Sequence, residues 1–215
     1  MAAAAIAANP SLAAAPWADL GTGSGALAIG LGTLLSKQQQ LQQQQQHQHQ
    51  HQQETEGAAA GSSPAVWAVD FSPSAAAYAA ANAAACTPPG AVRVVVGSWW
   101  EPLGHLRGQL GGVLTNPPYI PRAQMEGLQR EVGLHEPHSA LDGGPGPGLD
   151  SIQVICAGAG EMLMDGGYIA LETAGDDQAA RVKSLLESSG DFEGAGVVAD
   201  CYGVGRFVEA RRRRR

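Results

Sequence analysis

The chain has 215 residues, 44% of them hydrophobic, with 29 glycines and 13 prolines, so it is long enough for one domain with a real core. The formal net charge is −7. Without Arg211–Arg215 the chain has eight basic and 20 acidic residues, so the remainder of the chain carries a net charge of −12. An acidic body is a poor match for duplex nucleic acid. Three scattered cysteines without a Cys-x-x-Cys pair exclude a disulfide framework and a cysteine zinc site, and they favour a reducing compartment.

The first residues carry no recognisable targeting signal. Residues 1–15 are rich in alanine but lack a basic segment and any arginine, so they match neither a secretory signal nor a transit peptide. No apolar run approaches the roughly 20 residues that span a bilayer. We therefore expect a leader helix over 1–15 and no membrane association.

A glycine-rich turn follows the first predicted strand. The strand covers Pro16–Leu20, the turn is Gly21-Thr22-Gly23-Ser24-Gly25, and the apolar segment Ala26–Leu35 predicts a buried helix. This order is typical of the opening of a βαβ unit. Glycines allow the backbone to approach a ligand, and a helix N-terminus offers free N–H groups. Glycine-rich linkers show the same pattern, so these residues alone leave both interpretations open.

Residues 38–64 differ in composition from the rest. They are mostly glutamine and histidine, followed by small and polar residues, and such a segment buries too little apolar surface to offset its ordering entropy. We therefore predict a disordered insertion over 38–64, with no metal site in its histidines.

Leaving out the insertion reveals a second spacing. The segment Ala65–Asp70 predicts a strand that ends in an acid, 49 positions after Gly21. Without the 27 residues of the insertion the spacing is 22, close to the roughly 20 expected between a glycine turn and a ribose-binding acid. Ser72 and Pro73 then predict the capped start of a helix.

The remaining pattern alternates strands and helices. Strands are expected at 92–96, 112–115, 166–172, 195–199 and 206–209, with helices at 149–164 and 176–189. This predicts an α/β, Rossmann-like fold, with a seven-stranded, mostly parallel sheet, an antiparallel edge strand and helices on both faces. One domain would cover 16–209, interrupted by 38–64, and 210–215 would be a basic tail.

The segment Asn116-Pro117-Pro118-Tyr119 follows the fourth predicted strand. Proline fixes φ and pushes the preceding residue into extended geometry, so Asn116 and Pro117 would present acceptors to an outside group. A planar group with an NH2 would fit two acceptors and an aromatic ring. A plain turn after a strand is the alternative.

The strand ends share one edge of such a sheet, where ligands bind. Asp19, Asp70, Trp99 and Asn116 each lie at the carboxyl end of a predicted strand. An acid suits a ribose and an aromatic ring suits a purine. Because no Gly-Lys-Ser/Thr loop is present and no Lys or Arg lies near the glycine turn, a nucleoside with a cationic centre fits better than a polyphosphate. This favours S-adenosyl-L-methionine.

Four motifs in this order resemble the class I methyltransferases that N5-methylate a glutamine of peptide-chain release factors. They are Asp19–Gly25, Val69-Asp70-Phe71-Ser72, Gly97–Leu103 and Asn116–Pro121. Adenine-N6 DNA and RNA methyltransferases share the Asn-Pro-Pro-Tyr box. The stretch from Glu131 to Asp150 favours the release-factor group. The resemblance covers about residues 16–209, and the sequence around Trp99 and Glu131 is most similar to cyanobacterial and plastid-type members.

The resemblance implies a role for each matching residue. Gly21 to Gly25 would wrap the methionine part of S-adenosyl-L-methionine, Asp70 would hold the ribose and Trp99 would lie against the adenine. Asn116 and Pro117 would accept hydrogen bonds from the substrate amide, and Tyr119 would pack on the substrate. The implied cofactor contacts are Asp19, Gly21, Thr22, Gly23, Ser24, Gly25, Asp70, Ser98, Trp99 and Asn116. The implied substrate contacts are Asn116, Pro117, Pro118 and Tyr119, with Asn116, Pro117 and Tyr119 as the catalytic residues.

The resemblance also sets the expected partners. The substrate would be the glutamine of a release factor's Gly-Gly-Gln loop, and the protein would act as a monomer. Ser98 stands where many members carry an acid, and we expect the chain to lack the N-terminal substrate-recognition domain of the family. There are two alternatives. One is an adenine-N6 nucleic-acid methyltransferase, in which Arg211–Arg215 would bind phosphates instead of forming a solvated tail. The other is an inactive remnant that still binds the cofactor. The resemblance points to a chloroplast, although no transit peptide is visible.

Overall fold

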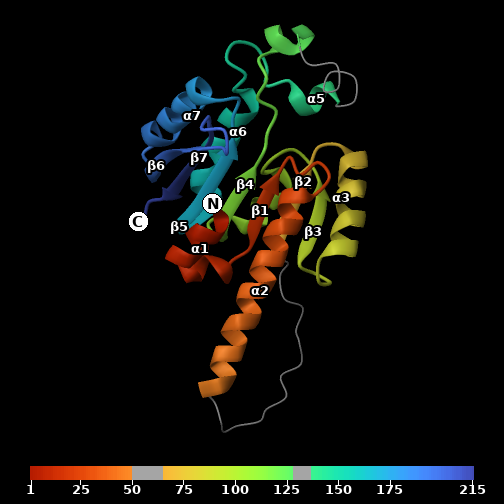
Figure 1. Cartoon of the computed structure of the whole chain (residues 1–215), viewed down its shortest axis with the longest axis vertical. Coiled ribbons are helices and arrows are strands. Elements are labelled where there is room, and N and C mark those ends of the chain that lie inside the picture. The colour runs from red at the N-terminus through yellow and green to blue at the C-terminus, as the bar shows by residue number, and fades with distance from the viewer. Residues whose placement is uncertain (50–64, 128–136) are drawn as a thin grey trace.

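The computed structural model describes residues 1–49, 65–127 and 137–215, and in this part of the chain seven strands form one sheet (Figure 1). The strands are β1 (Trp17–Leu20), β2 (Val66–Asp70), β3 (Val92–Val96), β4 (Leu110–Thr115), β5 (Leu163–Glu172), β6 (Phe192–Ala199) and β7 (Gly205–Arg212). Their order is β3-β2-β1-β4-β5-β7-β6, and β7 runs antiparallel to β5 and β6. The predicted fold class is confirmed, with the antiparallel strand one place inside the edge.

Helices cover both faces of the sheet (Figure 1). The α-helices are α1 (Ala2–Ala8), α2 (Ala26–His49), α3 (Pro73–Cys86), α5 (His138–Leu141), α6 (Asp150–Met162) and α7 (Asp176–Ser188). The 3-10 helices are η1 (Pro10–Ala13), η2 (Glu101–Leu106) and η3 (Arg122–Gly127). Ser72 caps α3 as predicted, because its hydroxyl accepts a hydrogen bond from the Ala75 N–H at 3.3 Å.

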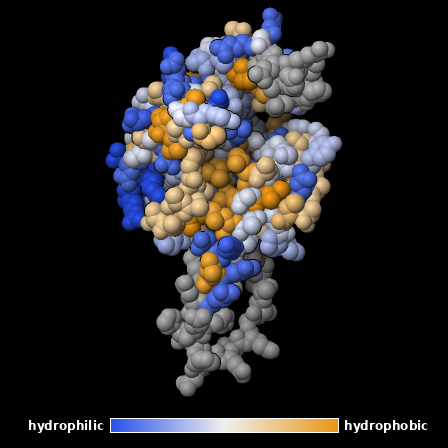
Figure 2. Space-filling model, in the orientation of Figure 1, coloured by the Kyte–Doolittle hydropathy of each residue, from blue (hydrophilic) through white to orange (hydrophobic). Residues whose placement is uncertain are grey.

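Two apolar cores result from the alternation of side chains along the strands. Trp17 packs with α1, η1 and α2 on one face, whereas its neighbour Ala18 packs with α6 and α7 on the other. Ile169 and Tyr168 divide between the faces in the same way. In the space-filling view, hydrophobic residues gather in the middle of the visible face, and hydrophilic ones gather on the β6–β7 side (Figure 2). None of the described helices is long and apolar enough to cross a membrane.

The N-terminal segment is not one continuous leader helix. Helix α1 ends at Ala8, and η1 begins at Pro10, whose ring cannot continue the helix. Leu12 is fully buried, and its carbonyl accepts a hydrogen bond from the Trp17 Nε1–H at 2.7 Å. The segment is thus part of the core, and the prediction of a single helix over 1–15 is wrong at its centre.

Helix α2 is longer than predicted and runs past the end of the sheet (Figure 1). It continues to His49 and so includes residues 38–49, which we predicted to be disordered. Glutamine is a good helix former, and no glycine or proline interrupts this run. The Gln39 amide also donates to the Ala13 carbonyl at 3.4 Å. The rest of the predicted insertion, residues 50–64, lies outside the described residues.

The predicted basic tail over 210–215 is wrong for 210–212, which lie in β7, whereas residues 213–215 are exposed beyond the strand. Strand β7 extends to Arg212, and Ala210 is buried within it. The Arg212 guanidinium donates to the Leu163 carbonyl at 2.7 Å and to Asp165 Oδ1 at 3.1 Å. Arg215 pairs with Asp191 at 2.6 Å. Sheet pairing and nearby acids therefore order a run that its charge alone suggested was a tail.

Candidate functional site

The carboxyl ends of four parallel strands bring the predicted residues to one edge of the sheet. Strands β3, β2, β1 and β4 are adjacent, and their registers place Asp70 opposite Val96 and Leu20 opposite Thr115. The glycine turn, Asp70, Trp99 and Asn116 follow directly from these ends. The register thus gives a physical basis for the predicted convergence.

The glycine turn is held by backbone hydrogen bonds to β2. The N–H groups of Gly21 and Thr22 donate to the Val69 carbonyl at 2.9 and 3.0 Å. Gly21 and Gly25 have φ angles of 71° and 89°, which favour glycine. A Cβ on Gly25 would lie 3.2 Å from the Cα of Ala79 in α3, so a glycine at this position also lets the turn pack closely on that helix.

Asp19 supports the turn from within the core. It is fully buried, and its Oδ2 accepts hydrogen bonds from Thr22 Oγ1 at 2.6 Å and from the Ala28 N–H at 2.9 Å. Its Oδ1 has no partner among the described residues. Burial raises the pKa of Asp19 to about 6, against the two hydrogen bonds that lower it. A donor or cationic group of a bound molecule would satisfy the remaining oxygen.

Asp70 joins the glycine turn to the start of α3. Its Oδ2 accepts from the Gly23 N–H at 2.8 Å, and its Oδ1 accepts from the Ser72 N–H at 2.9 Å. The carboxylate is only partly buried, and each oxygen has further acceptor capacity. The side chain is therefore fixed in place while it can still accept from a ribose hydroxyl. Ser24 is exposed on the same turn, and its carbonyl accepts from the Asn82 amide at 2.9 Å.

Trp99 lies beside the glycine turn in a strained backbone conformation. Its φ of 45° is the one positive value among described residues other than glycine, and such strain gathers at functional sites. A Cβ on Gly21 would lie 3.5 Å from Cζ3 of the indole, so the ring lies against the turn. Ser98 is half-buried, and its carbonyl accepts from the Glu101 N–H at 2.9 Å. Trp100 packs on α6 and donates to the Ile155 carbonyl at 3.2 Å.

Asn116 is exposed at the end of β4, next to the same turn. Its backbone carbonyl oxygen lies 3.8 Å from the position of a Cβ on Gly21. The preceding Thr115 hydroxyl donates to the Leu20 carbonyl at 2.6 Å and locks the ends of β4 and β1 together. Pro117 is buried and Pro118 half-buried. The backbone carbonyl of Asn116 is thus close to the glycine turn, and its side chain is exposed.

The segment from Asn116 to Pro121, here called the arm, is held against residues 141–148. The Ile120 N–H donates to the Leu141 carbonyl at 2.9 Å, and the Gly143 N–H donates back to the Ile120 carbonyl at 2.8 Å. A Cβ on Gly143 would lie 2.8 Å from the Tyr119 backbone, so the two segments touch. The stretch from Glu131 to Asp150, whose sequence favoured the release-factor group, therefore holds the arm in place through its residues 141–148. Its residues Glu131 to Glu136 lie outside the described residues.

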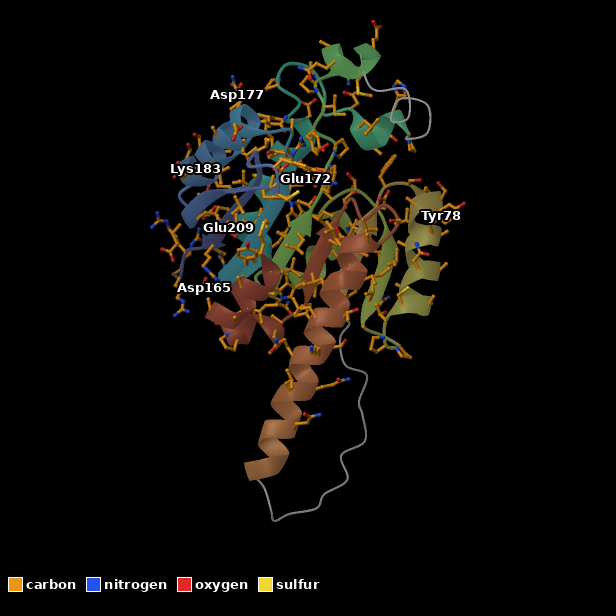
Figure 3. All side chains as sticks on the ribbon, viewed as in Figure 1. Tyr78, Asp165, Glu172, Asp177, Lys183 and Glu209 are labelled. Carbon is orange, nitrogen blue, oxygen red and sulfur yellow. The ribbon has the colours of Figure 1, made fainter. Side chains whose placement is uncertain are left out.

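Two polar residues near the arm were missed by the sequence analysis. Tyr119 donates through its hydroxyl to Glu172 Oε1 at 3.4 Å, and Glu172 ends β5 (Figure 3). Gln178 is 6% exposed, and its amide donates to the Tyr119 carbonyl at 2.9 Å. The available signal was a polar residue beside Ala179 on the buried face of α7.

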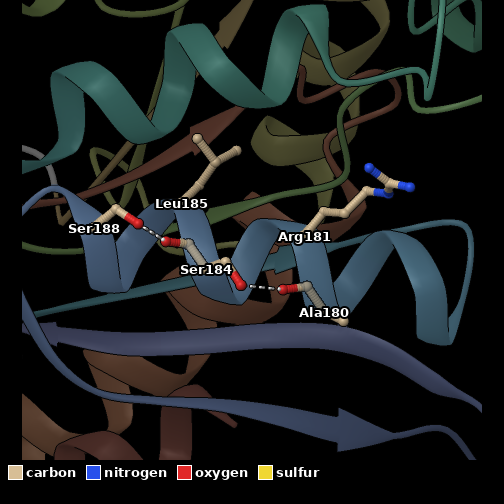
Figure 4. A pocket seen from close by; sticks show the side chains of 5 residues that line it. All are labelled: Ala180, Arg181, Ser184, Leu185 and Ser188. Carbon is tan, nitrogen blue, oxygen red and sulfur yellow. Dashed lines mark hydrogen bonds between the residues drawn. The ribbon is translucent and has the colours of Figure 1, made fainter.

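A separate shallow hollow on α7 offers little chemistry. It is lined by residues of this one helix, and the hydroxyls of Ser184 and Ser188 donate to carbonyls one turn earlier (Figure 4). Within the described residues no three His, Cys, Asp or Glu side chains form a possible metal site. The carboxyl edge of the sheet remains the candidate site.

Comparisons with known proteins agree with this geometry. A family model described as the RMKL-like methyltransferase domain matches residues 17–132. The chain is 41% identical over 146 residues to a release factor glutamine methyltransferase of Synechocystis sp., covering 68% of this chain and 48% of that protein. It is 39% identical over 148 residues to the protein of the same name from Moorella thermoacetica, covering 69% and 50%. The chain thus spans about half the length of the relatives it matches.

Solved structures share the fold at low identity. A putative rRNA methylase from Clostridium thermocellum gives a TM-score of 0.55 at 13% identity and covers 96% of this chain and 95% of its own. A methyltransferase from Pyrococcus furiosus gives a TM-score of 0.54 at 13% identity, covering 93% and 75%.

Proposed function

Because the chain belongs to the RMKL-like methyltransferase domain family, we propose that it methylates the side-chain amide nitrogen of a glutamine in a peptide-chain release factor, with S-adenosyl-L-methionine as the methyl donor. The observation that carries the proposal is the arm, with the exposed Asn116 beside the glycine turn and the rest held against residues 141–148. The curated relatives of this chain bear the name of that activity.

The residues at the carboxyl edge fit S-adenosyl-L-methionine. Asp70 has acceptor capacity for the ribose hydroxyls, and the Trp99 indole offers a face for the adenine. Asp19 is a buried carboxylate with one unpartnered oxygen, which suits a cationic molecule. Gly21 to Gly25 would contact the methionine part, with Ser98 near the adenine. When bound, the cofactor supplies a methyl group on a positively charged sulfur.

The arm would supply orientation and electrostatics. An amide nitrogen is a poor nucleophile because its lone pair is delocalised into the carbonyl. The Asn116 side chain and the Pro117 carbonyl would accept the two N–H groups, raise electron density on the nitrogen and direct its lone pair. Tyr119 would pack on the glutamine and Pro118 would stiffen the arm. Positioning of this kind accounts for most of the catalysis, and the proton leaves to water afterwards.

The terminal arginines weaken the case for nucleic acid. Arg212 and Arg215 are paired with Asp165 and Asp191, so the charge that phosphates would need is partly neutralised. The remainder of the chain is acidic. An adenine-N6 activity therefore stays the second candidate only through the shared Asn-Pro-Pro-Tyr box.

The test is methyl transfer from labelled S-adenosyl-L-methionine. We expect label on the glutamine of the Gly-Gly-Gln loop, located by mass spectrometry, and none on a release factor in which this glutamine is replaced by alanine. DNA and RNA oligonucleotides are tested in parallel, and label on adenine would support the second candidate. Cofactor binding by calorimetry without transfer to any of these would show an inactive remnant and overturn the proposal.

A further inference from the structure

Gln178 joins three segments of the chain around the arm. It is the third residue of α7, and its amide nitrogen Nε2 lies 2.7 Å from the Pro147 carbonyl, 2.9 Å from the Tyr119 carbonyl and 3.3 Å from the Gly148 carbonyl. Its Oε1 accepts from the Ala174 N–H at 2.8 Å. The amide thus links the arm, the 147–148 loop and the turn between β5 and α7.

The orientation of this amide follows from its partners. The Ala174 N–H can only donate, and the three carbonyls can only accept, so the NH2 must face the carbonyls. A Gln near the third helical position often reaches back to cap the helix N-terminus, and Oε1 alone serves that purpose. The NH2 makes contacts that a helix cap does not need.

The contacts of the NH2 lie where the arm touches the 147–148 loop. A Cβ on Gly148 would overlap the Tyr119 carbonyl, so the arm and the 147–148 loop are already in backbone contact. The Gln178 NH2 lies within hydrogen-bond distance of both the Tyr119 and the Gly148 carbonyls, so one donor group bridges the two segments. Gln178 supplies that donor from inside the protein, with only 6% of its surface exposed.

We propose that Gln178 is a positioning residue, which fixes the Tyr119 carbonyl and thereby the placement of Asn116 and Pro117 toward the acceptor nitrogen. This inference rests on the proposed function. It assigns the effect of Gln178 to the methyl-transfer step and not to cofactor binding, since none of its hydrogen-bond partners belongs to the glycine turn, Asp70 or Trp99. A misplacement of about 1 Å in such an arrangement costs on the order of 100-fold in rate.

The decisive variant is Gln178→Glu. It keeps the acceptor for the Ala174 N–H, and so the helix cap, but it replaces the NH2 by an oxygen that faces three carbonyls. Gln178→Met removes the amide while keeping its approximate volume, as a second variant. Gln153→Glu is the matched control, because Gln153 is exposed on α6 and the same change there alters the charge alone.

We expect kcat to fall about 100-fold in both Gln178 variants, with cofactor Kd within twofold of the parent. The Tm should fall as well, because buried carbonyls lose their donor, so the assay is run well below the Tm of each variant. In Gln178→Glu the carboxyl regains one O–H donor when it is protonated, so kcat should recover as pH falls. Gln153→Glu should match the parent. A kcat within threefold of the parent in a folded Gln178→Met variant would overturn the inference, as would a parallel loss of kcat and cofactor affinity.

A second readout separates this inference from the proposed function. The Ile120 and Gly143 N–H groups bond across the arm contact, so their hydrogen exchange reports whether the arm is held, with or without a substrate. Faster exchange at these two amides in Gln178→Glu, with exchange in β4 unchanged, is expected even if release factor is not the substrate. Unchanged exchange at Ile120 and Gly143 would show that Gln178 does not hold the arm.

Discussion

The Gly23 N–H donates to Asp70 Oδ2 at 2.8 Å, across 47 positions of the sequence. One end of this bond is in the turn after β1 and the other is at the end of β2, so the bond closes the βαβ unit at its carboxyl edge. The carboxylate is held by this bond and by the Ser72 N–H, and each oxygen can still accept a further hydrogen bond. Asp70 is therefore arranged before any ligand arrives, which lowers the entropic cost of binding.

Replacement of Asp70 tests this arrangement. We expect Asp70→Ala to weaken binding of S-adenosyl-L-methionine by about 10- to 100-fold, because two charge-assisted hydrogen bonds to the ribose would be lost, at roughly 1.5–3 kcal/mol each less the solvation regained. Asp177→Ala, an exposed acid on α7, controls for the change in net charge. Calorimetric titration measures both, and equal affinities in the two variants would contradict the role.

Replacement of Asn116 should have the opposite effect, because it should impair methyl transfer and leave cofactor binding nearly unchanged. Its side chain is exposed, so Asn116→Ala should change the Tm by no more than a degree or two and cofactor affinity by no more than a few-fold. Methyl transfer should be abolished, since one of the two acceptors for the substrate amide is removed. Single-turnover transfer and calorimetry on the same preparation separate these effects. A large loss of cofactor affinity would mean that Asn116 belongs to the cofactor site instead.

The strand ends could be predicted because their signals are local. A glycine turn, an acid and an Asn-Pro-Pro box each follow a short apolar run, and parallel strands bring such ends together whatever lies between them. Gln178 is harder to find in this way, because its partner Tyr119 is 59 positions distant and a polar residue on the buried face of α7 does not reveal which residue it contacts. Arg212 was misjudged for the same reason. Its place in β7 depends on pairing with β6, which outweighs a charge run that is typical of a tail.

The raised pKa of Asp19 predicts a pH dependence of stability. Its pKa is about 6 in the folded chain and 3.8 in the unfolded one, so between these values the folded state binds more protons. The free energy of unfolding should therefore fall as pH rises from about 4 to about 6 and level off above, by up to roughly 3 kcal/mol for this group.

Urea unfolding at pH 4 to 7, for the parent and for Asp19→Asn, isolates this contribution. The amide cannot ionise, so the difference between the two stabilities should change across this window in the stated direction. Other groups cancel in the difference. A difference that does not vary with pH would show that Asp19 has an ordinary pKa in the folded protein.

Arg212 is expected to matter for stability rather than for binding of nucleic acid. Its side chain is 13% exposed and donates to the Leu163 carbonyl and to Asp165. Arg212→Ala would leave that carbonyl short of a donor at the start of β5, which costs about 1–3 kcal/mol. Arg214→Ala, at an exposed position of the same run, should cost less than about 0.5 kcal/mol.

Urea unfolding of both variants measures the difference, and binding to a labelled RNA oligonucleotide at low salt measures the alternative. If the arginines served phosphates, the two substitutions would weaken RNA binding alike, since each removes one positive charge, and would barely separate in stability. If they order the C-terminal strand, stability separates them and RNA binding does not. The pairing of Arg212 with Asp165 and the Leu163 carbonyl favours the second outcome, because a guanidinium held by a carboxylate and a backbone carbonyl has fewer donors left for a phosphate.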